Sequence, residues 1–193
     1  MSTVGVLVRK ILLIAPALVL LACDLGVGDG DITATDWDWA LAIARSAVNK
    51  AYGEHWYIKA FGAEFLDKAG ALYDDPAHPP VWEVFYSDGS NTQLRVLIHA
   101  DGRYTIFEQK NPESGNLPLC STYDSDAVES WLRTASEVYR ELTGLADDAC
   151  YDIYCYHTSD GDYVSVGLFD ADLACLLRVV LLAQSGDIVG IYF

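Results

Sequence analysis

Four cysteines in the C-terminal part of the chain are the residues best suited to covalent chemistry: Cys120, Cys150, Cys155 and Cys175. The N-terminal segment has the pattern of an export signal, and the thiols of exported domains are usually oxidised. The even number therefore predicts two disulfides, for which three pairings exist. Metal binding is the alternative, but no Cys-x2-Cys pair occurs, and Cys155 with His157 lacks a further ligand at zinc spacing. We expect disulfides and no metal site.

Residues for catalysis form no recognised pattern. The sequence has no Gly-x-Ser-x-Gly, His-Glu-x-x-His, P-loop or dinucleotide-binding motif. Its four histidines are scattered, and its adjacent acidic pairs lie at expected element ends, where Asp acts as a cap or turn former. The sequence therefore predicts no enzyme, no catalytic residue and no cofactor.

Tyrosines gather on the strands expected in the last third of the chain. Because successive strand residues point to opposite faces, Tyr154 and Tyr156 share a face that excludes Ile153 and Cys155. Tyrosine has a large rigid surface with a polar tip and is enriched in binding patches. Two interpretations stay open: this face binds a partner, or it packs against the sheet of the other half.

The first 22 residues have the parts of a secretory signal peptide. Arg9 and Lys10 supply positive charge, and an apolar run follows from residue 11 to residue 22. This run is shorter than the roughly 20 apolar residues of a spanning helix. It ends in Leu20-Leu21-Ala22-Cys23, which resembles the lipobox of bacterial lipoproteins. The resemblance implies cleavage before Cys23, lipidation of Cys23 with diacylglycerol and a palmitate-type acyl chain, and anchoring to a bacterial membrane, facing the exterior or periplasm. The alternative is a secreted protein in which Cys23 pairs with another cysteine.

The chain is strongly acidic, with 12 Lys and Arg against 28 Asp and Glu and a formal net charge of −16. Removal of residues 1–22 leaves a net charge of about −18, because Arg9 and Lys10 are lost. Nucleic-acid binding requires basic residues, so we do not expect this acidic chain to bind nucleic acid. Anionic lipid headgroups would repel the domain, so membrane contact is expected through the acyl chains on Cys23. A protein partner is expected to be a basic envelope protein, although solubility alone also accounts for the charge.

Hydrophobic periodicity predicts two helices. Residues 23–35 are rich in Gly and Asp and read as a flexible tether. A helix is expected from residue 36 to Gly53, with apolar residues at spacings of three and four. A second helix is expected to begin at Asp126, in a capping box with Glu129, and to end at Gly144.

Short alternating segments predict the strands. Residues 82–86, 94–98 and 103–108 read as a three-stranded meander with a hairpin turn at Asp101-Gly102. Residues 54–72 are either further helix or an irregular turn around Gly62. Four more strands are expected in the second half, at residues 151–157, 163–169, 176–183 and 188–193.

The two halves look alike. Leu94-Arg95-Val96 matches Leu177-Arg178-Val179, and each match follows a helix. We therefore expect an α+β fold of two similar units, each a helix packed on an antiparallel β-sheet meander. Residues 36–108 are the first unit, 109–125 the linker loop and 126–193 the second unit.

The helix-then-meander pattern, with a Ser185-Gly186 turn before the last strand, resembles the PepSY domain in two copies, best over residues 126–193 and more faintly over residues 36–108. This resemblance implies an exported or membrane-bound protein and, in some members, inhibition of metallopeptidases. The tandem plan and the acidity also resemble secreted β-lactamase inhibitor proteins. The sequence thus favours a lipid-anchored binding or inhibitory module of the cell envelope. The alternatives are an envelope hydrolase without a recognised motif and a structural envelope lipoprotein.

Overall fold

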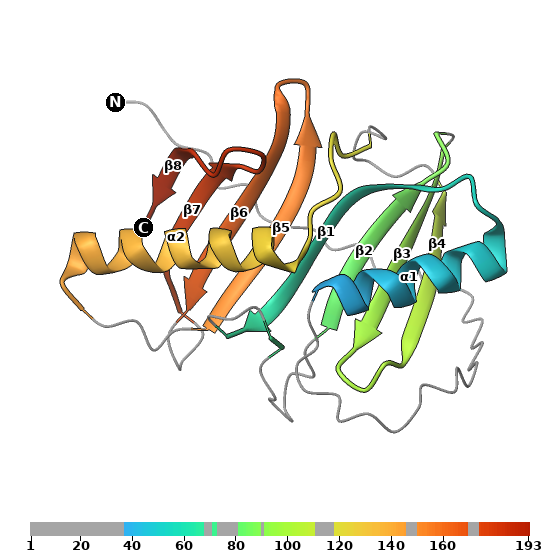
Figure 1. Cartoon of the computed structure of the whole chain (residues 1–193), viewed down its shortest axis with the longest axis horizontal. Helices are drawn as coiled ribbons and strands as arrows, with labels where there is room; N and C mark the ends of the chain where they lie inside the picture. Colours follow the sequence, from blue (N-terminus) through green and yellow to red (C-terminus); the bar gives the residue numbers. More distant parts are fainter. Residues whose placement is uncertain are drawn as a thin grey trace, which may run out of the picture.

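A computed structural model describes residues 37–67, 71–72, 81–89, 91–110, 118–145, 150–169 and 174–193. These residues form two helices, α1 (Trp37–Tyr52) and α2 (Ser125–Thr143), and one eight-stranded antiparallel sheet. The strands are β1 (Tyr57–Leu66), β2 (Val81–Ser87), β3 (Thr92–His99), β4 (Tyr104–Lys110), β5 (Cys150–Thr158), β6 (Gly161–Phe169), β7 (Cys175–Leu182) and β8 (Ile188–Tyr192). Both helices lie on the same face of the sheet (Figure 1). The expected signal peptide, the tether and Cys23 lie outside the described residues.

The strands run in the order β4-β3-β2-β1-β5-β6-β7-β8. At the centre, β1 pairs with β2 on one side and with β5 on the other, so that Phe61 lies opposite both Val84 and Cys155. This β1–β5 junction joins the two halves into one continuous sheet. The expected α+β fold of two similar helix-on-sheet units is therefore wrong. The fold is dominated by a single sheet that carries both helices on one face.

Strand β1 lies within residues 54–72, for which the sequence predicted either further helix or an irregular turn. Its centre, Ala60-Phe61-Gly62-Ala63, lacks the β-branched residues typical of strands. Close packing explains Gly62, because a Cβ there would lie 2.5 Å from the Ile153 carbonyl oxygen and 2.9 Å from the Tyr154 ring. Pairing on both sides therefore determines this strand, and its own residue preferences do not.

Both predicted helices are present. The first ends before Gly53, whose φ of 89° suits glycine. The second ends at Gly144, which has φ 69° and donates its backbone N–H to the Arg140 carbonyl oxygen. Its start differs from the prediction: Asp124 is the N-cap, and its carboxylate accepts from the Ala127 amide at 3.0 Å. Asp126 instead lies in the first turn. No helix in the described part of the chain has the length and apolarity needed to cross a membrane.

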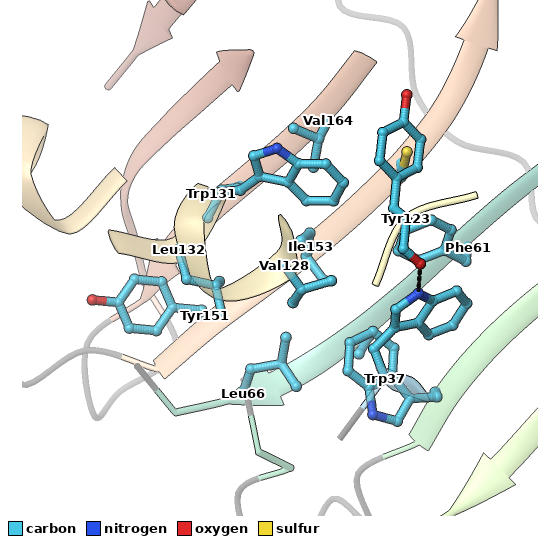
Figure 2. Close-up of a cluster of buried hydrophobic side chains, with 14 of the residues drawn as sticks. Trp37, Phe61, Leu66, Tyr123, Val128, Trp131, Leu132, Tyr151, Ile153 and Val164 are labelled. Carbon is cyan, nitrogen blue, oxygen red and sulfur yellow. Dashed lines mark hydrogen bonds between the residues drawn. The ribbon is translucent and has the colours of Figure 1, made fainter. Parts of the chain in front are cut away.

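One hydrophobic core lies between the sheet and both helices (Figure 2). The Phe61 ring of β1 stacks on Trp37 of α1 with ring centroids 4.0 Å apart, and lies 6.5 Å from the Trp131 ring of α2. The Trp37 indole Nε1 also donates to the Tyr123 carbonyl oxygen at 2.6 Å. Because one ring of β1 contacts a tryptophan from each helix, the core is continuous across the two halves.

The matched segments occupy comparable places. Leu94-Arg95-Val96 lies on β3 and Leu177-Arg178-Val179 on β7, each the third strand outward from the β1–β5 junction. In both segments the Leu and Val side chains are buried in the core. Internal duplication of the sequence stays a prediction.

Candidate functional site

The sheet face opposite the helices, here called the open face, carries a row of aromatic side chains. Phe85 of β2, Tyr154 and Tyr156 of β5, and Tyr163 of β6 lie next to one another, with ring centroids 6.2, 5.7 and 6.2 Å apart in that order. In the described part of the chain no helix or strand packs on this face, and Tyr154 keeps 42% of its surface exposed. Since both halves form one sheet, the interpretation that this face packs on the other half is wrong.

Small residues of the central strand β1 allow aromatic rings on its two neighbouring strands to contact each other. Ala60 and Gly62 of β1 lie between β2 and β5 on the open face. Neither has a side chain that reaches over the sheet, so the rings of Phe85 and Tyr154 make an edge contact across β1. The aromatic row is therefore continuous across the β1–β5 junction.

Two ion pairs flank the aromatic row. Glu83 of β2 pairs with Arg95 of β3. Asp152 of β5 pairs with Arg178 of β7 at 2.7 Å, across Gly167 of β6, which has no side chain to separate them. Partly exposed pairs stabilise a fold only modestly. Their effect here is to neutralise charge beside the aromatic centre, the arrangement of an apolar centre with a polar rim.

The central tyrosines are neutral phenols. Burial and the Glu83 carboxylate raise the pKa of Tyr154, while burial and the neighbouring Tyr163 and Tyr192 raise the pKa of Tyr156. Each hydroxyl can therefore donate a hydrogen bond at physiological pH as well as accept one.

The structure holds the four described cysteines as free thiols: Cys120 and Cys175 are exposed, Cys150 is half-buried and Cys155 is buried in the core. Cys150 and Cys175 lie on opposite sides of Phe169 of β6. Two strand spacings separate their Cα atoms by about 10 Å, beyond the roughly 7 Å that a disulfide spans. That the four cysteines form two disulfides stays a prediction. The strand register excludes one of the possible bonds, Cys150–Cys175.

A polar cluster that the sequence did not predict lies on the helix side of the sheet. Its centre is the carboxylate of Asp162, a residue with 3% of its surface exposed. This carboxylate accepts from the Cys120 amide at 2.7 Å, the Tyr123 hydroxyl at 2.8 Å and the His157 Nδ1 at 2.8 Å. The Ser121 amide adds a longer bond of 3.3 Å. Asp162 therefore fastens residues 120–123 to the β5–β6 hairpin.

The cluster has the residue types of a cysteine nucleophile with its base, but not the geometry. The Cys120 Sγ lies 3.5 Å from the His157 Nδ1, the same nitrogen that contacts Asp162. An ionised carboxylate only accepts, so Nδ1 carries a proton and cannot take one from the thiol. Partial loss of hydration and the Asp162 charge also raise the pKa of the exposed Cys120 thiol, whereas a nucleophilic thiol needs a lowered one. The arrangement favours anchoring over nucleophilic chemistry.

The same three side chains could ligate a metal, since their ligand atoms lie within 4.8 Å of one another. The contact between His157 Nδ1 and Asp162 Oδ1 is 2.8 Å. Nitrogen and oxygen ligands on a tetrahedral zinc lie about 3.3 Å apart. The observed distance is that of a hydrogen bond, which a metal would have to open. The expectation of no metal site stays a prediction.

No protein-family model, curated protein or solved structure matches this chain. Nothing in these comparisons indicates catalysis. The resemblances to bacterial lipoproteins and to the PepSY domain stay predictions.

Proposed function

We propose that this chain is a non-catalytic binding or inhibitory module of the bacterial cell envelope, exported and lipid-anchored at Cys23, which binds a basic protein through its open face. The observation that carries the proposal is the row of Phe85, Tyr154, Tyr156 and Tyr163, in which Tyr154 is exposed and the other three are half-buried, on a sheet whose other face packs on the core. An aromatic centre of this kind supplies most of the binding energy in protein interfaces.

Charge supports the choice of partner. With Glu83 and Asp152 paired within the open face, the acidity of the chain, −16 overall, lies mainly outside the aromatic row. Such a field attracts a basic surface from a distance and accelerates encounter, whereas the desolvated aromatic centre slows dissociation. The two properties can therefore be tested separately by rate measurements.

Rates on a partner recovered by co-purification from the native membrane test the open face. We expect Tyr154→Ala and Tyr156→Ala each to raise the dissociation rate at least about tenfold, because interface tyrosines are common hot spots. Raising the salt from low to physiological should slow association and leave dissociation almost unchanged. Leu142→Ala, which alters an exposed residue of α2, is the matched control. Association that ignores salt, with both tyrosine variants like the wild type, would contradict the proposal.

The anchor has its own test. We expect Cys23→Ser to abolish metabolic labelling with a fatty-acid analogue and to leave the protein uncleaved or soluble, because the acyl chains are its only membrane contact under this proposal. Cys120→Ser serves as the control and should label as the wild type does. A Cys23→Ser protein that still labels and sediments with membranes would refute the lipid anchor.

A further inference from the structure

Strand β8 forms one edge of the sheet and pairs with β7 on its inner side. No strand lies on its outer side in the described part of the chain. Residues 188–193 also carry no charged side chain. The other edge strand, β4, ends in the exposed residues Glu108, Gln109 and Lys110, and charges of this kind keep an edge from pairing with another chain. Of the two edges, β8 is therefore the one open to pairing.

Exposed apolar side chains gather at this edge. Eight large apolar residues are exposed among those that the structure describes, and Tyr154 on the open face is one of them. The other seven are Leu142 and Leu145, at the end of α2, and all of residues 188–193 except Gly190. Together these seven expose roughly 800 Å², about the area that each partner contributes to a stable interface. An apolar patch of this size is typical of an interaction site.

The core is uncovered at the same end of the sheet. Ile191 of β8 lies opposite the buried Val179 of β7, so both side chains point to the helix side. Ile188 is related in the same way to the buried Leu181. Ile188 and Ile191 nevertheless stay 45% and 40% exposed. The helix side of β8 is therefore an open end of the core.

Helix α2 continues beyond the strands that support it. It packs on β6 and β7, and its C-terminal end reaches past β8 (Figure 1). Val138 and Tyr139 are buried, whereas Leu142, one turn further along the same apolar stripe, is 54% exposed. A strand added beside β8 would bring apolar side chains beneath this end of the helix.

We propose that β8 pairs antiparallel with β8 of a second copy, so that the two eight-stranded sheets of a symmetric dimer become one. A two-fold axis perpendicular to the sheet keeps the helices of both copies on one face, and the two open core ends then cover each other. A second copy fits because both partners supply an uncharged strand, and no charge is buried. A basic partner does not fit, since residues 188–193 have no acidic side chain. The open face stays uncovered, so the dimer does not depend on the function proposed above.

Sedimentation equilibrium of the full chain, in a detergent of matched density, tests the dimer. We expect twice the monomer mass, with a dissociation constant on the order of 10 μM or lower. Ile191→Lys should raise this constant at least about a hundredfold, because the dimer would bury the ammonium group, whereas in the monomer it reaches water. Gln109→Lys, which adds the same charge to the β4 edge, is the matched control and should dimerise as the wild type does.

A charge swap keeps the test decisive if Ile191→Lys folds poorly. Val189 lies near the middle of β8, so like charges at this position meet close to the two-fold axis. Val189→Lys and Val189→Glu should each dimerise weakly, and their equimolar mixture should associate at least about tenfold more tightly than either alone. Poor folding of the variants would not produce such a gain on mixing.

Salt separates this interface from the open face. Each copy carries a net charge of −16, so two copies repel each other at a distance, and raising the salt should strengthen the dimer. Binding of a basic partner to the open face should instead weaken. The inference is overturned if the wild type stays monomeric at about 100 μM in physiological salt, if folded Ile191→Lys dimerises as the wild type does, or if mixing the Val189 variants brings no gain. A dimer that is lost in Tyr154→Ala but kept in Ile191→Lys would also overturn it, whereas a monomeric chain would leave the proposed function standing.

Discussion

Replacing Asp162 by alanine is expected to reduce the free energy of unfolding by about 3–5 kcal/mol, the range for breaking a buried charged network. The variant leaves the buried Tyr123 hydroxyl without its acceptor, together with the Cys120 amide and the His157 ring nitrogen. Urea denaturation measures the change. Asp160→Ala is the control, because Asp160 is exposed on the same hairpin and should change stability by less than about 0.5 kcal/mol. Equal effects of the two variants would show that Asp162 does not anchor the segment.

The contribution of Asp162 has a defined pH dependence. Burial disfavours its ionised form, but the hydrogen bonds from Cys120, His157, Tyr123 and Ser121 outweigh burial and lower the pKa of this carboxyl. A group with a lowered folded pKa stabilises the fold above its unfolded pKa, about 3.9 for Asp, and loses that contribution as the pH falls through the folded value. The stability difference between wild type and Asp162→Asn should therefore stay level near neutral pH and shrink below about pH 4. A difference that grows on acidification would contradict the assignment.

Trp37→Ala is expected to cost about 3–5 kcal/mol, the usual range for truncating a buried tryptophan. Trp37 is 1% exposed, stacks on Phe61 and donates to the Tyr123 carbonyl oxygen. Trp39→Ala, at a partly buried position of the same helix, should cost less than half as much. Thermal unfolding followed by both far-UV circular dichroism and tryptophan fluorescence measures the loss.

The same variant tests whether the core is shared. Because Phe61 contacts Trp37 and also lies near Trp131 of α2, weakening α1 should lower the stability of both halves together. We expect one transition with the same midpoint by both probes. Two separate transitions, with the second half unaffected, would contradict a single cooperative sheet.

Local signals in the sequence predicted the elements well. The spacing of apolar residues located α1 and α2, and Gly53 and Gly144 marked their ends. The Asp101-Gly102 hairpin turn is present, with Gly102 at φ 82°. These features depend on residues within a few positions of one another, which is why sequence pattern suffices for them.

The assembly of the sheet depends on contacts that no local pattern encodes. Strand β1 is built of small residues around Phe61, and only pairing with β2 and β5 makes it a strand. Because the sequence did not predict β1 as a strand, it suggested two separate sheets. The aromatic face was visible because Tyr154 and Tyr156 alternate with the buried Cys155 on one strand.

The polar cluster was missed because its members are far apart in the sequence. Cys120 meets Asp162 from 42 positions away. One signal was present: Asp162 alternates with Val164 and Val166, both buried, so a carboxylate occupied a core-facing strand position. A carboxylate in such a position must find donors, and this requirement could have directed attention to it.

The β1–β5 junction also governs how the chain folds after synthesis. The hairpins of β2, β3 and β4 and those of β5, β6 and β7 join neighbouring segments and can form early, whereas Ala60 must find Tyr156, 96 positions away in the sequence. Pairings of such long range slow folding, because loop closure costs entropy before the contact stabilises anything. Until they meet, β1 and β5 each present an unpaired strand edge, the kind of edge that recruits other chains. The interval between hairpin formation and closure is therefore when this protein is most prone to aggregate.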